Sequence, residues 1–245
     1  MDYKMIEELA LNNWPALTTL LYDGWVLRFA EGYTKRSNSV SPLYGSGSDL
    51  ELKIGACEKI YAEQGIRIAF KITPFVQPEH LDAVLERKGY SLIDETSMQT
   101  LALDNLSEPR LKDVRITGEA GGEWLDAYAR MGRLTPAQLA TAQRMFANIK
   151  TKAGYMAQYH NGHIVSCGLG VVERDYIGLY GIMTDAEYRN RGFGEQMILN
   201  LLQWGKANGA NHSYLAVVAN NAPAQALYAK IGYKEVYRHW YRVKE

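Results

Sequence analysis

The chain has 245 residues, of which 47% are hydrophobic, enough for one large domain or two domains of ordinary size with packed cores. Its 27 basic and 27 acidic side chains give a formal net charge of zero, so we expect no nucleic-acid partner, although a local basic patch is not excluded.

No membrane or secretion signal is visible in the sequence. The N-terminus has no basic region followed by an apolar core, and no run of about 18 apolar residues occurs. We therefore expect a cytoplasmic protein with no membrane partner. Cys57 and Cys167 are the only cysteines, too few for a disulfide framework or a cysteine-based zinc site. Their apolar neighbours predict two small buried residues and no metal.

The first hundred residues predict a helix, a hairpin and then alternating strands and helices. The first helix covers 3–13 and ends before Pro15, because the residue before a proline disfavours helix. Asp23-Gly24 between the apolar runs 17–21 and 25–30 predicts a β-hairpin. There follow a polar loop at 31–37, a strand at 38–44 with Pro42 at an edge or bulge, a helix at 50–64, a strand at 66–72, a helix at 78–88 and one or two strands at 91–103.

The helix at 50–64 carries two further expectations. Leu52, Ala56 and Ile60 are expected to share a face, and Ser48 or Asp49 is expected to cap its N-terminus.

A polar stretch at 104–112 predicts a domain boundary, with one domain at 1–106 and a second at 112–245. In the second domain, Thr135-Pro136 predicts a capped helix start and Asn161-Gly162 predicts another hairpin turn. The expected elements are a strand at 114–116, helices at 123–130 and 136–148, strands at 155–159, 164–173 and 176–183, a helix at 195–207, a strand at 213–218, a helix at 222–230 and strands at 233–243.

The stretch 176–194 is where we expect the chemistry, because an apolar strand ends in a basic, glycine-rich turn that opens a helix. The first N–H groups of a helix have no partner within it, and the helix dipole attracts an anion to that end. Gly192 and Gly194 allow close approach of the backbone to a pyrophosphate, while Arg189 and Arg191 supply positive charge.

The spacing of Arg189, Gly192 and Gly194, Arg-x-x-Gly-x-Gly, resembles the acyl-CoA pyrophosphate loop of the GNAT superfamily of N-acetyltransferases. Downstream, residues 221–233 resemble the family's second motif, Asn-x-x-Ala-x-x-x-Tyr followed by Lys-x-Gly-aromatic. The order of elements in 112–245 is also that of a GNAT domain. The resemblance implies an α/β (α+β) fold of the GNAT type, with a mixed, mostly antiparallel sheet flanked by helices.

The resemblance also implies roles for individual residues. Acetyl-CoA would be the co-substrate, with its pantetheine arm along the strand end at Met183 and Thr184. Tyr228 falls where many members place the general acid for the leaving thiolate, a role suited to a phenol whose pKa of about 10 lies near that of a thiol; the alternative is that it only packs its helix on the sheet. The remaining cofactor-binding residues implied are Arg189, Arg191, Gly192, Phe193, Gly194 and Asn221.

The general base is left open. Family members often carry a glutamate in the strand before the loop, but Tyr180 and Gly181 occupy those positions here. Possible substitutes are Glu173, Asp185, His160 and His163, and a water chain is the alternative.

The first half resembles a degenerate second copy of the same fold, making the protein a tandem. Residues 85–90, Leu-Glu-Arg-Lys-Gly-Tyr, repeat the pattern of 228–233. At the position of the glycine loop it has only 44–49, with no arginine and with Asp49 at the helix start, so we expect no CoA there. We expect this half to be structural or to wall off the acceptor pocket. A polar cluster that would suit an acidic or polar acceptor, unless it is only a solvated loop, is formed by Arg28, Lys35, Arg36 and Asn38 around Trp25, Phe29 and Tyr33.

The sequence therefore predicts an N-acetyltransferase that transfers an acetyl group from acetyl-CoA to a primary amine by direct attack. The acceptor, a small molecule or a peptide, is not identified, and monomer and homodimer both stay open. One alternative is an acyl-CoA-binding regulatory module without turnover. The other is an aminoacyl-tRNA-dependent transferase, which the zero net charge and the Arg-x-x-Gly-x-Gly loop oppose.

Overall fold

The computed structural model describes residues 2–45, 47 and 49–244. Its first half follows the predicted order, beginning with a helix that Asp2 caps through hydrogen bonds from the N–H groups of Lys4 and Met5. The elements are α1 (Tyr3–Asn13), β1 (Thr18–Tyr22), β2 (Trp25–Phe29), the 3₁₀ turn η1 (Lys35–Ser37), β3 (Val40–Ser41), α2 (Leu50–Glu63), β4 (Ala69–Ile72), α3 (Leu81–Arg87) and β5 (Ser91–Ala102).

The second half also follows the predicted order. Thr135 begins its helix with a capping box, in which the Thr135 and Gln138 side chains each bond the other residue's backbone. The elements are β6 (Val114–Thr117), α4 (Gly122–Gly132), α5 (Pro136–Ala147), β7 (Lys152–His160), β8 (His163–Glu173), β9 (Tyr176–Thr184), η2 (Ala186–Tyr188), α6 (Phe193–Ala207), β10 (His212–Val218), α7 (Ala222–Ile231) and β11 (Lys234–Val243).

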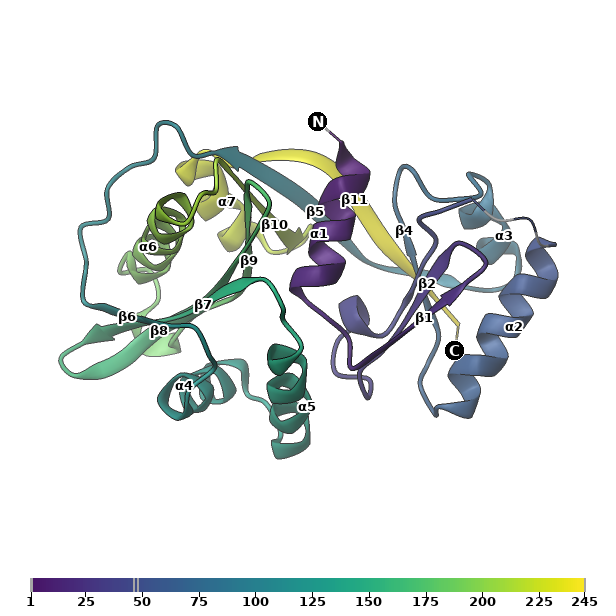
Figure 1. The fold of residues 1–245 in the computed structure, drawn as a ribbon, viewed down its shortest axis with the longest axis horizontal. Helices are drawn as coiled ribbons and strands as arrows, with labels where there is room; N and C mark the ends of the chain where they lie inside the picture. The colour runs from purple at the N-terminus through teal and green to yellow at the C-terminus, as the bar shows by residue number, and fades with distance from the viewer. Residues whose placement is uncertain (1, 46, 48, 245) are drawn as a thin grey trace.

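Within the described residues the strands form one eleven-stranded sheet in the order β1-β2-β3-β4-β11-β5-β10-β9-β8-β7-β6. Among the strand pairs of the described residues, only β3–β4 and β9–β10 are parallel, so the sheet is mixed and mostly antiparallel, as predicted. In the second half α6 lies over one face of the sheet and α4 over the other (Figure 1). No helix in the described part of the chain is long and apolar enough to cross a membrane.

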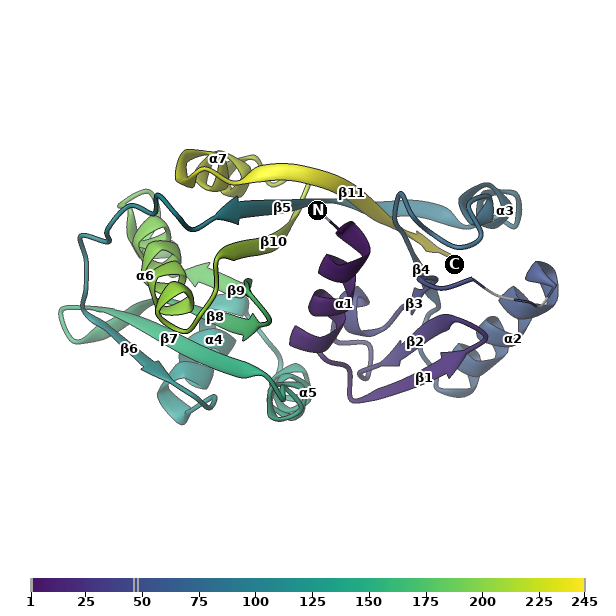
Figure 2. The ribbon, with the colours of Figure 1, turned by 45° about the horizontal axis from the view of Figure 1, so that its top comes forward.

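Two long strands tie the halves together. β5 is a single strand of 12 residues that pairs with β10 along one edge and with β11 along the other. β11, the last strand, pairs in turn with β4. Each half-sheet is thus extended by the final strand of the other half, and both strands run from one lobe to the other (Figure 2). The division of the chain at 106 and 112 stays a prediction, because the sheet itself is continuous across it.

The internal echo is visible in the backbone. Gly89 (φ 82°) ends α3 and Gly232 (φ 111°) ends α7, and each is followed by a buried tyrosine and a long strand. In both places the tyrosine N–H bonds the carbonyl five residues earlier, from Tyr90 to Leu85 and from Tyr233 to Tyr228, at 3.0 Å. This is the Schellman geometry, which a glycine in the left-handed region allows. The structure therefore contains two copies of one helix-to-strand corner.

Three first-half predictions need corrected bounds, and the buried face of α2 is an addition to them. The strand expected at 38–44 covers only Val40–Ser41, because Pro42 has no N–H to donate to a neighbouring strand. The strand expected from 66 begins at Ala69, and the helix expected from 78 begins at Leu81. Leu52 is 76% exposed, since α2 instead buries the stripe of Lys53, Ile54, Cys57 and Tyr61. Asp49 caps α2 by accepting from the Leu52 N–H, whereas Ser48 lies outside the described residues.

Helix α1 belongs to the core of the second half. Ile6 and Leu9 are fully buried in the same cluster as Trp124, Phe146 and other residues of the second half. A separate cluster of the first half packs around Trp25 and Phe70. Figure 1 shows α1 lying between the two lobes, so burial of its apolar face fixes the lobes against each other.

A buried ion pair lies at this junction. Glu7 on α1 accepts from the Lys71 ammonium on β4, and both side chains are almost completely buried. The second Glu7 oxygen accepts from the Tyr237 hydroxyl on β11 at 2.6 Å. The pKa of Lys71 is lowered because burial disfavours its charged form, and the Glu7 carboxylate opposes that shift. One carboxylate therefore links three elements from both halves.

Candidate active site

The glycine loop is a sharp turn between β9 and α6. Asn190 (φ 59°) and Gly192 (φ 86°) both adopt left-handed backbone conformations, and Gly192 is the N-cap of α6. The helix begins at Phe193, two residues earlier than predicted, so the N–H groups of Phe193, Gly194 and Glu195 have no partner within the helix. The turn thus presents several unpaired N–H donors at the positive end of a 15-residue helix.

The side chain of Phe193 anchors this loop. It is buried, with its ring 5.2 Å from the His160 ring and 5.7 Å from the Tyr188 ring. Arg191 lies over the rings of Tyr188 and Phe193, and Arg189 donates from Nε to the Thr184 carbonyl at 3.3 Å. Aromatic packing and one hydrogen bond therefore hold the loop in shape before any ligand is bound.

A pocket of about 730 Å³ extends from this loop to α7. It is bounded by β9, the loop, the start of α6 and the first two turns of α7. Seven of the eight predicted cofactor-binding residues line it, and Arg191 does not: the seven are Met183, Thr184, Arg189, Gly192, Phe193, Gly194 and Asn221. Asn221 also caps α7, accepting from the Ala224 N–H at 3.3 Å through its side-chain oxygen. The tertiary structure thus brings the two sequence motifs together around one space.

The pocket lies where β9 and β10 separate. Their parallel pairing covers only 176–178 with 212–214 and then stops. Further along β9, Gly181 has a φ of 56°. It lies where the pairing register between β8 and β9 shifts. A Cβ at this position would lie 2.9 Å from the Tyr128 ring, so only glycine allows α4 to pack so closely. Within the described residues, β9 therefore makes no strand pairing with β10 beyond residue 178, and the pocket lies beside this segment.

Tyr228 does not line this pocket, although its neighbour Leu227 does. Its ring packs against Tyr233 at 5.8 Å, and burial raises the pKa of its hydroxyl. Within the described residues the Tyr228 hydroxyl has no hydrogen-bond partner. It is not among the unpaired side-chain oxygen and nitrogen atoms that are shielded from solvent. The ring therefore contributes to packing while the hydroxyl stays accessible, and its catalytic role stays a prediction.

A second pocket, of about 470 Å³, lies at the junction of the two halves, and we call it the junction pocket. Gly181 of β9 lines it, directly before Ile182 and Met183, which line the first pocket. Helix α4 also contributes to both pockets: Tyr128 lines the junction pocket, and Met131 lines the first pocket. The first half supplies Trp14, Tyr33, Thr34, Lys35, Arg36, Asp94 and Thr96, and the second half adds Ala216, Val218, His239 and Tyr241.

Much of the predicted acceptor cluster is structural. The Arg28 side chain is 2% exposed and donates to the backbone carbonyls of Leu11, Trp14 and Arg36. Burial lowers its pKa to about 10. The Asn38 amide bonds the backbone of Ala30, Gly32 and Thr34 within its own loop. Trp25 and Phe29 pack within or against the first-half core instead. Of the cluster, only Tyr33, Lys35 and Arg36 reach the junction pocket.

None of the four acid or histidine residues considered as a base lines either pocket. Glu173 accepts from Asn12 at 2.9 Å, and Asp185 is ion-paired with Arg130. His160 packs behind the loop, and His163 is exposed at the hairpin turn. In the part of the chain that the structure describes, no group of three or more His, Cys, Asp or Glu residues could hold a metal ion. Cys57 and Cys167 are buried, as predicted, and burial raises the pKa of each thiol to about 12.

Sequence reasoning missed His239, which lines the junction pocket. Its side chain lies in the middle of β11, where it pairs with Thr96 of β5 and is 3% exposed. Its Nδ1 is buried without a hydrogen-bond partner among the described residues. The available signal was the alternation of Tyr237, His239 and Tyr241 in the last strand. This pattern shows that the three side chains share a face of the sheet, but it does not predict that the face borders a cavity.

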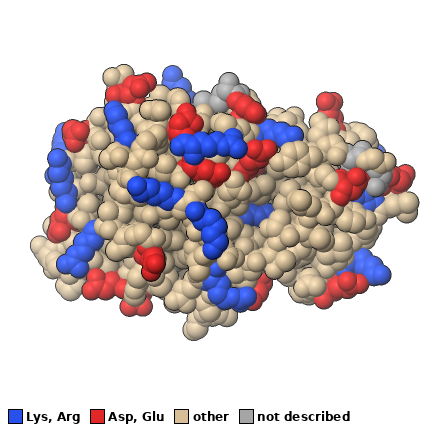
Figure 3. Space-filling view, in the orientation of Figure 1, with Lys and Arg blue, Asp and Glu red and all other residues tan. Residues whose placement is uncertain are grey.

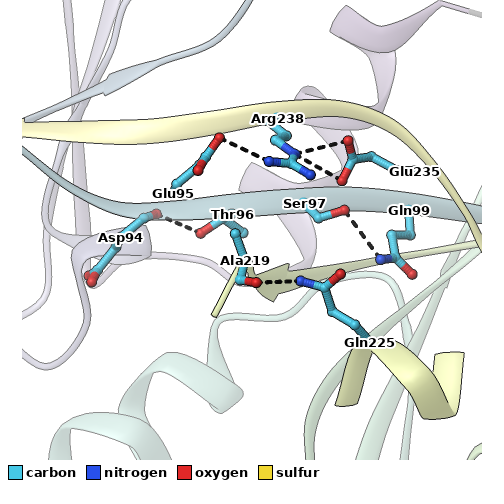
Figure 4. A network of polar contacts seen from close by, with 9 residues as sticks. All are labelled: Asp94, Glu95, Thr96, Ser97, Gln99, Ala219, Gln225, Glu235 and Arg238. Carbon is cyan, nitrogen blue, oxygen red and sulfur yellow. Dashed lines mark hydrogen bonds and ion pairs between the residues drawn. The ribbon is translucent and has the colours of Figure 1, made fainter. Parts of the chain in front are cut away.

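Polar contacts shape the strand segment opposite His239. Asp94 has a positive φ of 52° at a bulge in β5, and the Thr96 hydroxyl donates to the Asp94 carbonyl at 2.8 Å. On the same strands Arg238 links Glu95 and Glu235, as Figure 4 shows. The bulge places the Asp94 carboxylate 2.7 Å from the Lys35 ammonium, so these two charges at the pocket compensate each other.

Burial of His239 is expected to make stability depend on pH. Its pKa lies well below the ordinary value of 6.5 because burial disfavours the charged ring, and the positive charges of Lys71 and Arg36 add to this. Below pH 6.5 the unfolded chain binds a proton that the folded chain does not, so this histidine costs about 1.4 kcal/mol of stability per pH unit there.

The measurement is urea unfolding of the wild type and His239→Gln between pH 7 and 5. The variant should gain stability relative to the wild type as the pH falls. A difference in stability that stays constant with pH would contradict the buried neutral state of His239.

Comparisons with known proteins show that this chain is similar to acetyltransferases. Residues 2–243 match the family described as "Probable histone acetyltransferase Rv0428c C-terminal". A relative from Bacillus subtilis (strain 168), the uncharacterized N-acetyltransferase YobR, is 29% identical over 248 residues, covering 99% of each chain. A GCN5-related N-acetyltransferase from Kribbella flavida has a similar structure, with a TM-score of 0.74 at 15% identity over 98% of this chain and 95% of that one. A tandem GNAT protein from the clavulanic acid biosynthesis pathway gives 0.66 at 12% identity over 97% and 87%.

Proposed function

Because the chain belongs to the GNAT superfamily, as an acetyltransferase of the family that matches residues 2–243, we propose that it transfers the acetyl group of acetyl-CoA to a primary amine by direct attack. The observation that carries this proposal is the 730 Å³ pocket beside the separated strands β9 and β10, with the glycine loop lining it.

Each part of the pocket suits one part of acetyl-CoA. The N–H groups at the start of α6 suit the pyrophosphate, and the end of β9 at Met183 and Thr184, past the residues where β9 pairs with β10, suits the pantetheine arm. The reaction forms a bond between the amine nitrogen and the thioester carbonyl carbon and breaks the bond from that carbon to sulfur. Tyr228 gives its proton to the leaving sulfur, and the proton lost by the amine passes to water. A tyrosine whose pKa is raised by burial stays protonated at neutral pH, as this role requires.

The test is release of CoA from acetyl-CoA in the presence of a panel of primary amines. We expect release that depends on both acetyl-CoA and an amine, with the acetylated amine as the product. A protein that binds acetyl-CoA without consuming it in the presence of any amine would instead be a regulatory binding module. Salt-sensitive tRNA binding would revive the aminoacyl-tRNA alternative.

The glycine loop supplies a sharper prediction. Gly192→Ala should raise the KM for acetyl-CoA by about 10-fold, because a Cβ on a residue with a φ of 86° strains the turn that aims the N–H donors. Gly162→Ala is the matched control, since Gly162 has a φ of 78° at a hairpin turn whose residues line neither pocket. Both variants should lose about 1 kcal/mol of stability. Equal KM values for the two variants would show that the Gly192 conformation does not matter for binding.

A further inference from the structure

Arg36 is a half-buried cation in the junction pocket with no acceptor of its own. Within the described residues its guanidinium forms neither a hydrogen bond nor an ion pair, although its backbone carbonyl accepts from Arg28 at 2.6 Å. It lies 5.6 Å from the Trp14 ring centre and 5.9 Å from the Tyr180 ring centre. Aromatic faces can hold a guanidinium in place while leaving its N–H donors free.

The other charges around this pocket are compensated or absent. Lys35 is paired with Asp94 at 2.7 Å, and Lys71, behind His239, is paired with Glu7. His239 is neutral at pH 7, because its pKa lies well below its usual value. Among the described residues that line the pocket, Arg36 therefore carries the one uncompensated positive charge.

The segment that carries Arg36 is held rigidly. Asn38 bonds the backbone at Ala30, Gly32 and Thr34, and Arg28 bonds the Arg36 carbonyl. These hydrogen bonds hold the backbone around η1 in place. The loop that carries Arg36 is therefore ordered without any contact from the Arg36 side chain. A preorganised donor loses less entropy when it binds a ligand.

Arg36 is also close to the proposed site of acetyl transfer. Adjacent residues of β9, Gly181 and Ile182, line the junction pocket and the acetyl-CoA pocket respectively. The positive charge of Arg36 reaches Tyr228, where it lowers the pKa against the effect of burial. An acceptor held by Arg36 would therefore enter the reaction from the side opposite the glycine loop.

We propose that the acceptor is a primary amine that also carries a carboxylate, and that Arg36 binds this carboxylate in the junction pocket. The proposal rests on the acetyl transfer proposed above. A guanidinium and a carboxylate are both planar and can form two parallel hydrogen bonds. One carboxylate also carries a single negative charge, which would balance the positive charge of Arg36. A phosphate monoester would bring about 1.5 to 2 charges, more than Arg36 alone balances. The aromatic walls formed by Trp14, Tyr33, Tyr128 and Tyr241 suit the apolar part of such an acceptor.

The experiment compares amines in matched pairs that differ only in the carboxylate: L-phenylalanine with phenethylamine, L-tyrosine with tyramine, and 4-aminobutyrate with propylamine. Release of CoA is measured for the wild type, Arg36→Gln, Arg36→Lys and Arg87→Gln. For at least one pair the wild type should prefer the carboxylate by roughly 10- to 100-fold in kcat/KM, as expected for a charge-assisted hydrogen bond.

Arg36→Gln should remove this preference by raising the KM for the carboxylate amine, and Arg36→Lys should restore part of it. Arg87→Gln, which removes an exposed positive charge on α3, should keep the full preference. Three results overturn the proposal: equal rates within every pair, a preference that persists in Arg36→Gln, or a stronger preference for O-phosphoethanolamine over ethanolamine than for any carboxylate. If the wild type binds acetyl-CoA but acetylates no amine at all, the proposed function itself fails, and this inference falls with it.

Discussion

Replacing Tyr228 with phenylalanine is expected to lower kcat by about 100-fold or more while changing the affinity for acetyl-CoA by less than about twofold. The substitution removes only the hydroxyl, which has no hydrogen-bond partner among the described residues, and keeps the ring that packs against Tyr233. Without an acid the thiolate must leave unprotonated, so the loss should appear in the chemical step. The measurement is steady-state CoA release at saturating amine together with equilibrium binding of acetyl-CoA.

Tyr3→Phe is the control for this substitution, because Tyr3 is exposed at the start of α1 and lines neither pocket. It should leave kcat and the affinity for acetyl-CoA unchanged. A thiol ester with a better leaving group should also recover part of the rate in Tyr228→Phe. Unchanged turnover in Tyr228→Phe would remove this tyrosine from the mechanism and leave it with a packing role alone.

The second large effect is expected at the junction of the two halves. Glu7→Gln should lower the free energy of unfolding by about 3–5 kcal/mol, because it leaves the Lys71 ammonium buried without a counter-charge. The amide also fits poorly where the Tyr237 hydroxyl donates a hydrogen bond. Urea unfolding followed by tryptophan fluorescence measures the change.

Two variants make this result interpretable. Glu8→Gln, one residue along the same helix, loses only partly exposed contacts with Tyr44 and Arg174 and should cost less than about 1 kcal/mol. The double variant Glu7→Leu with Lys71→Met removes both charges and should recover much of the loss. A loss below about 1 kcal/mol for Glu7→Gln would mean that water reaches Lys71 and that the junction opens in solution.

The pH prediction and the loop prediction concern two different pockets. His239 reports on the burial of the junction pocket, and Gly192 reports on the acetyl-CoA pocket. A failure in one therefore does not imply a failure in the other, since the two residues lie on separate elements and line separate pockets.

Local chemistry made much of the architecture predictable. Asp23-Gly24 and Asn161-Gly162 form the expected hairpin turns with positive φ at all four residues. The cap at Thr135 begins its helix as predicted, and the left-handed Gly232 ends the last helix. Each of these signals acts between residues a few positions apart, so the sequence carries it in full.

Predictions that needed the facing partner were less secure. The sequence puts Leu52 on one apolar stripe of its helix, but α2 turns the face with Ile54 and Tyr61 inward, where the Tyr61 hydroxyl donates to the Arg28 carbonyl at 3.0 Å. Arg28 was expected near the acceptor, yet it is buried against backbone carbonyls. A helical period shows that apolar residues recur, but only the partner surface decides which of two overlapping stripes is buried.

The sequence by itself determined the order of the elements, the turn and cap residues, the glycine loop and the family, because these depend on short-range patterns that a single chain displays. Only the tertiary structure decided that β5 lies between β10 and β11, that α1 packs in the second half, and that Arg36 and His239 border one pocket. Those outcomes depend on which apolar faces and strand edges bury each other across more than a hundred residues, and such pairings leave no local trace in the sequence.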